Sequence, residues 1–300
     1  MRAPRHFLRL RDLSEPELGE LLDRADALKA LRRAGRRERT LDGKGVVLVF
    51  EKASTRTRMS LEAAVAELGG HAMVLDGRTS QLGRGETLAD TARVLSGYAD
   101  AIVFRTAATA RLQELAQYAS IPVINGLSDD AHPLQLLADI MTIRESLGGI
   151  AGKRVSFVGD GASNMARSFC EAAPLFGFAL RIACPERYAP PPDEVDTSCT
   201  EITHDARAAG VDADVIVTDV FTSMGQEAEA TERHYAFDGF QVNADLVARA
   251  PAHAIVLHCL PAHRGEEITA EVIDGPRSRA WAEAENRMHT AKALLELLIR

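Results

Sequence analysis

The 300-residue sequence has no apolar run long enough to cross a membrane. Its four cysteines lie far apart without a Cys-x-x-Cys pair, which argues against a disulfide framework or a structural zinc site. The basic N-terminus lacks the apolar core of a secretory signal. A net charge of −8 disfavours a general nucleic-acid binder. These absences predict a cytoplasmic protein with neither a nucleic-acid nor a membrane partner.

Short apolar segments alternate with stretches of helical periodicity, which is the β-α-β rhythm of a parallel sheet. Strands are predicted at Val46–Phe50, His71–Leu75, Ala101–Phe104, Pro122–Asn125, Arg154–Val158, Leu180–Ala183, Val215–Asp219 and Ile255–His258. Helices are predicted at Met59–Leu68, Leu88–Tyr98, Ala110–Ala119, Leu134–Leu147, Ala162–Phe176, Asn243–Ala250 and Ala282–Ile299. The predicted fold is α/β, with two doubly wound parallel-sheet domains linked by helices. The first domain covers 1–133, with a C-terminal helix (about 284–300) packing back on it, and the second covers 134–283.

The segment Ser54–Arg58 places five hydroxyl or guanidinium side chains directly after the buried strand Val46–Phe50. A helix follows, so the cluster lies where unpaired backbone N–H groups and the helix dipole favour an anion. Guanidinium groups suit the geometry of a phosphate. An ordinary Ser/Thr helix cap with two solvated arginines is the alternative, but such caps rarely alternate hydroxyl and guanidinium over five residues. The segment therefore predicts a phosphate site.

A second polar cluster, His132-Pro133-Leu134-Gln135, opens the helix Leu134–Leu147. A histidine at a helix N-terminus tends to be neutral, and a neutral imidazole can donate a hydrogen bond to a carbonyl oxygen. A simple capping histidine is the alternative interpretation. Arg105 follows the strand Ala101–Phe104 and so lies at the same ligand-binding edge. Taken alone, an arginine at this position is more often an ordinary surface residue.

The segment Gly159-Asp160-Gly161 resembles part of a dinucleotide fingerprint, but Asn164 stands where the third glycine belongs. No acidic residue follows a clean strand at the expected distance. A nicotinamide-dependent dehydrogenase is therefore disfavoured. An amide at this helix start fits a small polar ligand better.

Two further clusters follow strands near the C-terminus. Asp219 ends the strand Val215–Asp219, and the turn Ser223-Met224-Gly225 offers N–H groups and a hydroxyl to a carboxylate. A helix-capping role is the alternative for Asp219. The other cluster is His258-Cys259-Leu260-Pro261, whose Leu-Pro bond is a candidate for the cis form. His258, Cys259 and His263 carry metal-capable atoms, but their spacing matches no zinc signature, so no metal is predicted.

Together these segments resemble the aspartate/ornithine carbamoyltransferase family over nearly the whole chain. Ser54-Thr-Arg-Thr-Arg58 and His132-Pro-x-Gln135 match the wider family, whereas Asp219-x-x-x-Ser-Met-Gly225 and His258-Cys-Leu-Pro261 match its ornithine-specific branch. The segment Glu285–Thr290 matches as well. The resemblance implies transfer of the carbamoyl group of carbamoyl phosphate to the side-chain amine of L-ornithine. The first domain would then bind carbamoyl phosphate, the second would bind ornithine, and no cofactor would be required.

The resemblance also implies a role for each matched residue. Carbamoyl phosphate would be bound by Ser54, Thr55, Arg56, Thr57, Gln81, Arg105, His132, Gln135, Cys259, Leu260 and Arg287. Ornithine would be bound by Asn164, Asp219, Ser223 and Met224. The catalytic residues would be Arg105, His132, Asp219 and Cys259. Gln81 would reach a neighbouring subunit's site in a homotrimer or a multiple of trimers.

Two positions depart from the family pattern, and some alternatives stay open. Leu134 stands where threonine or cysteine is usual, and Arg84 stands where lysine commonly precedes Gly-Glu. Neither change removes a group that the chemistry needs. N-acetylornithine and putrescine remain possible second substrates. A non-catalytic paralogue would be expected to have lost His132 or Arg105, and both are present.

Overall fold

The structure, a computed structural model, describes residues 4–223 and 225–299. The chain forms two compact units. The first unit contains the chain up to Ala138 together with the segment from Glu285 onward, and the second unit is Asp139–Ala284. The chain passes between the units within α5 (Pro133–Leu147) and again within α11 (Ala280–Leu298).

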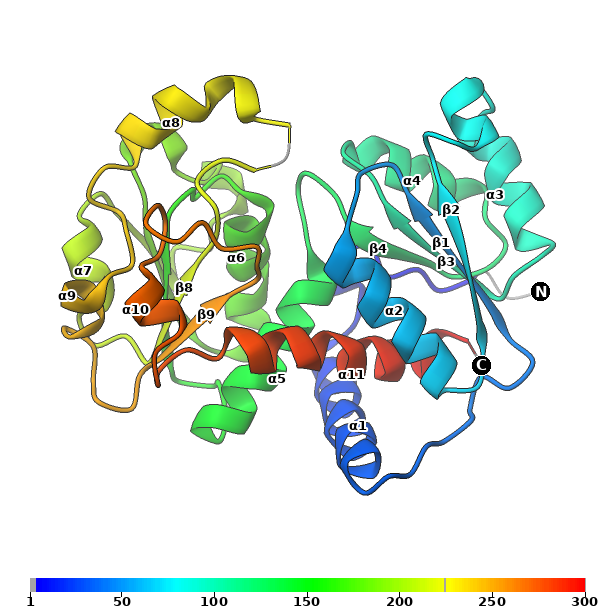
Figure 1. Ribbon diagram of the computed structural model, residues 1–300, viewed down its shortest axis with the longest axis horizontal. Coiled ribbons are helices and arrows are strands. Elements are labelled where there is room, and N and C mark those ends of the chain that lie inside the picture. The colour runs from blue at the N-terminus through cyan, green and yellow to red at the C-terminus, as the bar shows by residue number, and fades with distance from the viewer. Residues whose placement is uncertain (1–3, 224, 300) are drawn as a thin grey trace. The chain divides into compact units, whose positions relative to one another are not determined.

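The first unit is built on a four-stranded parallel sheet of order β2-β1-β3-β4 (Figure 1). Its strands are β1 (Gly45–Phe50), β2 (His71–Asp76), β3 (Ala101–Arg105) and β4 (Val123–Leu127). Its helices are η1 (Leu10–Asp12), α1 (Glu15–Arg33), α2 (Thr55–Glu67), η2 (Gln81–Arg84), α3 (Leu88–Ser96) and α4 (Thr109–Tyr118). The central strands β1 and β3 are almost wholly buried, as their continuous apolar sequences predict. The edge strand β2 is much more exposed.

Helices cover both faces of this sheet. Alternate residues such as Val47 and Val49 of β1 pack with α3 and α4 in one apolar cluster, and α2 covers the other face. The C-terminal helix α11 is tied to the first unit by two buried lysines. Lys29 of α1 donates to Asn286 over 2.6 Å, and Lys292 donates to Glu67 of α2 over 2.8 Å.

The second unit contains a five-stranded parallel sheet of order β7-β6-β5-β8-β9. Its strands are β5 (Arg154–Val158), β6 (Ala179–Ala183), β7 (Thr200–Thr203), β8 (Val215–Thr218) and β9 (Ile255–His258). Its helices are α6 (Asn164–Phe176), η3 (Glu186–Tyr188), η4 (Pro192–Glu194), α7 (Ala206–Gly210), η5 (Glu227–Glu229), α8 (Ala230–Ala236), α9 (Ala244–Val247) and α10 (Ala270–Ile273). Phe157 of β5 meets Phe169 of α6 with ring centroids 6.2 Å apart, and this contact joins the helix to one face of the sheet.

The predicted fold class is confirmed, since both sheets are parallel and doubly wound. The sequence did not predict the helices α1, α7, α8 and α10 or the strand β7. The helix α1 carries a clear signal, a capping box of Ser14 and Glu17. The strand β7 carries almost none, because Thr200–Thr203 contains a single large apolar residue at the sheet edge. Within the described ranges, no helix combines the length and the apolar character needed to span a bilayer.

The strand orders identify where each sheet would bind a ligand. In the first sheet the order reverses between β1 and β3, and in the second between β5 and β8. Ligands of open α/β sheets bind beyond the carboxyl ends of the strands on either side of such a reversal. Three of the polar segments singled out from the sequence begin there, after Phe50, Val158 and Thr218, and Arg105 is the last residue of β3 at the same edge.

Candidate active site

The segment Ser54–Arg58 lies in the first turn of α2. The sequence predicted that the helix starts at Met59, which was wrong, because α2 begins at Thr55. The Oγ of Ser54 caps the helix by accepting from the backbone N–H of Thr57 over 3.3 Å. Ser54 to Thr57 therefore lie at the positive end of a helix of 13 residues, which suits an anion.

The buried hydroxyl of Thr57 joins two arginines that are distant in sequence. Its Oγ1 accepts from Nη1 of Arg105 over 3.3 Å and from Nη2 of Arg287 over 3.0 Å. Arg105 comes from the end of β3, and Arg287 comes from α11. Two guanidinium groups thus meet at the N-terminus of α2, so the local charge is strongly positive although the chain is acidic overall.

His132 and Gln135 complete this group, here called the Thr57 cluster. Nη1 of Arg287 bonds to Nε2 of His132 over 3.2 Å and also donates to Oε1 of Gln135. An arginine can only donate, so Nε2 of His132 is the acceptor and its proton belongs on Nδ1. Burial, followed by the charges of Arg287, Arg105 and Arg56, holds the pKa of His132 well below its ordinary value of 6.5. His132 is therefore a neutral imidazole at physiological pH, as its place at a helix start predicted.

The remaining residues of the motif differ in exposure. Arg56 is half-buried, whereas Thr55 is exposed. Arg58 points away from the cluster into an ion pair with Glu62 of 2.9 Å, one helical turn along. Gln81 is exposed on η2, and no side-chain hydrogen bond seen within residues 4–223 and 225–299 links it to the Thr57 cluster.

The second unit brings another set of predicted residues together, here called the Asp219 cluster. Asp219 follows β8 directly, and Cys259 follows β9. The thiol of Cys259 donates to Oδ1 of Asp219 over 3.1 Å, and the same oxygen accepts from the backbone N–H of Val220 over 2.8 Å. Burial and the nearby Asp219 raise the pKa of Cys259 well above its ordinary value. Cys259 is therefore a neutral thiol and not a nucleophilic thiolate.

The other ornithine-site candidates lie on neighbouring loops. Asn164 is half-buried in the first turn of α6, after the N-cap Ser163. Ser223 is half-buried, and its backbone N–H donates to the side chain of Gln226 over 3.0 Å. Met224 lies outside the described residues. The Leu260–Pro261 bond is cis, and Leu260 has a φ of 60°, in the left-handed region.

Two buried residues that the sequence did not assign to the site hold this last loop. His258 accepts at Nδ1 from the backbone N–H of Leu260 over 2.9 Å, so Nε2 carries the proton and donates to Glu267 over 3.0 Å. Oε1 of Glu267 also accepts from the backbone N–H of His263 over 2.6 Å. The available signal was the paired Glu266-Glu267 shortly after the His-Cys-Leu-Pro segment.

Metal-capable atoms do come close together in this region. Asp219, His258 and Cys259 offer ligand atoms within 4.8 Å of one another, and so do His263, Glu266 and Glu267. Both ring nitrogens of His258 are engaged with protein groups, and the Cys259 thiol is bonded to Asp219. An ion at the first group would have to displace these bonds.

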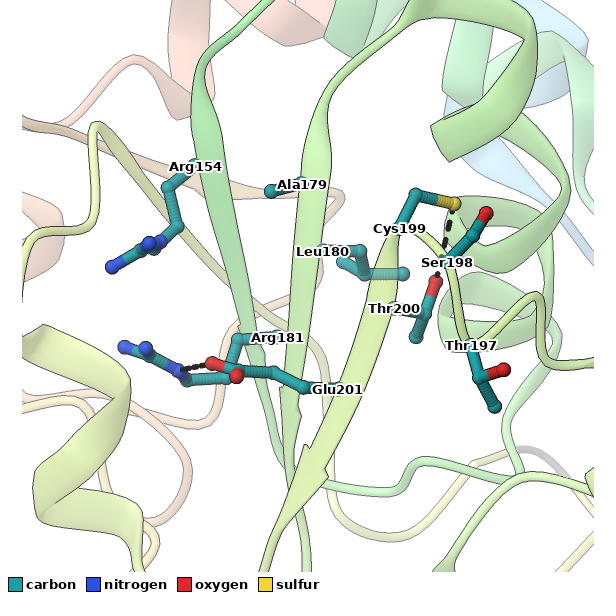
Figure 2. A pocket seen from close by; sticks show the side chains of 9 residues that line it. All are labelled: Arg154, Ala179, Leu180, Arg181, Thr197, Ser198, Cys199, Thr200 and Glu201. Atoms are coloured by element: carbon teal, nitrogen blue, oxygen red, sulfur yellow. Dashed lines mark hydrogen bonds and ion pairs between the residues drawn. The ribbon is translucent and has the colours of Figure 1, made fainter.

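A cavity lies at the amino ends of β5, β6 and β7, at the opposite edge of this sheet from the Asp219 cluster (Figure 2). Arg154, and Arg181 with its partner Glu201, lie on one side of the strands in Figure 2, and Cys199 beside Thr200 lies on the other. The polar groups do not converge on a common point. The cavity therefore offers no arrangement suited to catalysis.

Family models match both units. The carbamoyl-phosphate-binding domain of aspartate/ornithine carbamoyltransferases matches residues 5–145, and the aspartate/ornithine-binding domain matches residues 151–298. The chain belongs to the aspartate/ornithine carbamoyltransferase family. An ornithine carbamoyltransferase of Sorangium cellulosum is 54% identical, with 99% of this chain and 98% of that protein covered. One from Methylococcus capsulatus is 52% identical, with 99% of each covered.

Solved structures of this carbamoyltransferase family have the same fold. The ornithine carbamoyltransferase of Pyrococcus furiosus aligns with a TM-score of 0.94 at 48% identity, covering 99% of this chain and 97% of that one. The anabolic ornithine carbamoyltransferase of Campylobacter jejuni aligns with a TM-score of 0.91 at 38% identity, covering 98% of each chain. The family resemblance stated from the motifs is thus confirmed.

Proposed function

We propose that this protein transfers the carbamoyl group of carbamoyl phosphate to the side-chain amine of L-ornithine, giving L-citrulline and phosphate. The observation that carries the proposal is the Thr57 cluster, in which two guanidinium groups and a neutral histidine meet at a helix N-terminus. The similarity to ornithine carbamoyltransferases over nearly the whole chain supports the choice of substrates.

In this proposal the first unit binds carbamoyl phosphate. The backbone N–H groups at the start of α2 and the side chains of Ser54, Thr55, Arg56 and Thr57 hold the phosphate. The carbamoyl group is surrounded by Arg105, His132, Gln135 and Arg287. It is also bound by two residues that belong to the second unit, Cys259 and Leu260. The support is the network through Thr57 and Arg287, which sets the positions of Arg105, His132 and Gln135.

The second unit binds ornithine. Asn164, Ser223 and Met224 hold its α-amino and α-carboxylate groups, together with the carboxylate of Asp219. A cationic α-amino group favours Asp219 as a partner, and the hydroxyl of Ser223 can donate to a carboxylate. The positions of Asn164 after β5 and of Asp219 and Ser223 after β8 support this assignment.

The reaction requires a neutral amine. Ornithine's side-chain amine resembles that of lysine, so deprotonating it at pH 7 costs about 4–5 kcal/mol. Asp219 is the strongest acceptor near the proposed position of the amine, while Cys259 and the Leu260 carbonyl orient it. The amine nitrogen forms a bond to the carbamoyl carbon, the bond from that carbon to the phosphate oxygen breaks, and one amine proton is released.

Charge that grows on the carbamoyl oxygen is stabilised by donors of the Thr57 cluster. The guanidinium of Arg105 and the hydroxyl of Thr57 donate hydrogen bonds to this oxygen. The Nδ1 proton of neutral His132 gives it a donor that does not depend on protonation near pH 7. Each such donor contributes roughly 3–4 kcal/mol when it is aimed at the developing oxyanion. Holding the two reactants in line supplies much of the remaining acceleration.

Assembly and location are further parts of the proposal. We infer a homotrimer or a multiple of trimers, because Gln81 and the edge strand β2 are exposed where a second subunit could meet them. The substrates proposed correspond to a step of arginine biosynthesis or of a urea-cycle type, and the widely spaced cysteines favour a cytoplasmic location. In this proposal the reaction requires no cofactor. Light scattering of the purified protein would measure the assembly.

The deciding experiment is a citrulline assay on the purified protein with carbamoyl phosphate. Ornithine, N-acetylornithine, putrescine and aspartate are supplied in parallel, and each carbamoylated product is measured. Product from ornithine alone supports the proposal. Product from another amine would leave carbamoyl phosphate as the proposed donor but would replace ornithine as the proposed acceptor. No product from any amine would refute the activity. Asp219→Asn should lose ornithine turnover while still binding carbamoyl phosphate.

A further inference from the structure

The loop after β8 carries the proposed ornithine-binding residues Asp219 and Ser223, and its described parts, 219–223 and 225–226, belong to no helix or strand. Bonds among these described residues are local, such as the N–H of Gln226 donating to the carbonyl of Ser223 over 3.0 Å. Something outside the loop must therefore hold it at a fixed place. The anchor is Phe221, the buried residue between Asp219 and Ser223.

Phe221 is held through both its side chain and its backbone by α8 and the residue that follows it. Its ring stacks on that of Phe237, with centroids 4.6 Å apart and planes within 9° of parallel. Its carbonyl oxygen accepts from Nε of Arg233 over 2.6 Å. Arg233 is 3% exposed, so this is a charged hydrogen bond in a dry environment, where such a bond is stronger than at the surface.

The same guanidinium reaches a second loop. Its Nη2 pairs with the buried carboxylate of Asp160, just after β5. The other oxygen of Asp160 accepts from the N–H of Ala162 over 2.9 Å, and its carbonyl accepts from the N–H of Ser163 over 3.1 Å. These bonds shape the turn that leads to the helix cap Ser163 and to Asn164 in the first turn of α6.

Aromatic rings keep water from this ion pair. The guanidinium carbon of Arg233 lies 4.8 Å from the ring centre of Tyr188 and 5.6 Å from that of Phe237. The two loops also approach each other closely. A Cβ added at Gly159, which has a φ of 136°, would lie 3.6 Å from the Phe221 ring.

We propose that Arg233 is a positioning residue for the second substrate. It sets the spacing between the loop of Asn164 and the loop of Asp219 and Ser223, by bonding Asp160 on one side and Phe221 on the other. The inference rests on the proposed function, since it assigns those loops to ornithine. Arg233 also pairs with Glu229 of η5 over 3.6 Å, but none of its described bonds reaches the Thr57 cluster. Its loss should therefore weaken ornithine use and spare carbamoyl phosphate.

The test is steady-state kinetics of Arg233→Lys, Arg233→Met and Asp160→Asn, with each substrate varied separately. Lysine keeps the charge but cannot serve Asp160 and Phe221 at once. We expect the ornithine KM of Arg233→Lys to rise about tenfold, the effect of losing one charged hydrogen bond. The KM for carbamoyl phosphate should stay within about twofold, since none of these bonds touches its cluster. Arg233→Met should be more severe, because it leaves Asp160 buried without its cation.

Arg187→Met is the matched control. Arg187 also lies over the Tyr188 ring, at 5.9 Å, and pairs with Glu232 of α8, but it is exposed and contacts neither loop. Both of its KM values should match the parent. Thermal unfolding shows which variants are folded. If Arg233→Met does not fold, the two other single variants, Arg233→Lys and Asp160→Asn, still test the inference.

Three results would overturn the inference. The first is a folded Arg233→Lys with the parent's ornithine KM, the second is an equal rise in both KM values, and the third is the same shift in Arg187→Met. Activity of the parent separates the two proposals. If the parent is active and the ornithine KM is unchanged in Arg233→Lys, only the positioning role is refuted. If the parent forms no citrulline, the proposed function and this role are both refuted.

Discussion

Nη2 of Arg287 donates to the Oγ1 of Thr57 over 3.0 Å, although 230 positions separate the two residues. Thr57 lies in the first turn of α2 and Arg287 lies on α11, so the contact ties the C-terminal helix to the proposed phosphate site. The same hydroxyl also accepts from Arg105. One oxygen atom thus sets the positions of two cations.

Replacing Thr57 by valine tests this arrangement with little change of volume. Thr57→Val removes the shared acceptor, so Arg105 and Arg287 lose a common anchor. We expect kcat/KM for carbamoyl phosphate to fall roughly ten- to a hundredfold, as for the loss of one or two charged hydrogen bonds. Thr57→Ser keeps the oxygen and should recover most of the rate. Equal rates for the valine variant and the parent would show that the hydroxyl is dispensable.

The two arginines of the Ser54–Arg58 segment should differ sharply. Arg56→Ala removes a cation close enough to depress the pKa of His132, and we expect the KM for carbamoyl phosphate to rise roughly thirtyfold or more. Arg58→Ala removes a side chain already paired with Glu62 at the surface, and its KM should change less than about twofold. Initial rates of citrulline formation would measure both. Near-normal kinetics in Arg56→Ala would refute the phosphate assignment.

The buried pair of His258 and Glu267 predicts a loss of ornithine turnover on mutation. His258→Leu leaves the backbone N–H of Leu260 without its acceptor, and we expect kcat/KM for ornithine to drop roughly ten- to a hundredfold. Glu267→Gln keeps an acceptor oxygen for Nε2 and should be milder. The control is His263→Ala, since the His263 side chain is exposed. Unchanged ornithine kinetics in a folded His258→Leu would contradict the role of this pair.

His289 predicts a dependence of stability on pH. Its ring is buried in the first unit without a hydrogen-bond partner among the residues described, and Glu285 is 3.6 Å away. Burial, followed by the charges of Lys292, Lys29 and Arg32, lowers the pKa of His289 to about 3, against the opposing effect of Glu67. The unfolded chain therefore binds this proton first, and the free energy of unfolding falls as pH drops from 6.5 towards 3.

Urea unfolding at pH 7 and pH 5 would measure this effect. Replacing His289 by glutamine should reduce the slope of the unfolding free energy against pH. The reduction should correspond to about one fewer proton taken up on unfolding. An exposed histidine, changed in His71→Gln, is the control and should leave the slope as in the parent. A slope in His289→Gln as steep as that of the parent would show that His289 does not titrate in this window.

The sequence was sufficient to predict most of both sheets. Buried parallel strands are continuous apolar segments, so β1, β3, β5, β8 and β9 are visible locally. Their carboxyl ends meet at one edge of each sheet, so the polar segments after them were correctly expected at that edge. The predicted start of α2 was wrong. The Ser/Thr/Arg segment forms the first turn of the helix, but it lacks the apolar periodicity by which a helix is predicted.

The residues around those polar segments were decided by tertiary packing. Arg233 and Asp160 are 73 positions apart, and neither carries a local signal that distinguishes it from a surface ion pair. The pairing of His258 with Glu267 was likewise invisible, as both residue types are common in loops. Sequence by itself determined the strands, the loops at their ends and the family. Tertiary structure decided which side chains share a bond, because such bonds depend on how distant helices pack and on which charges are buried together.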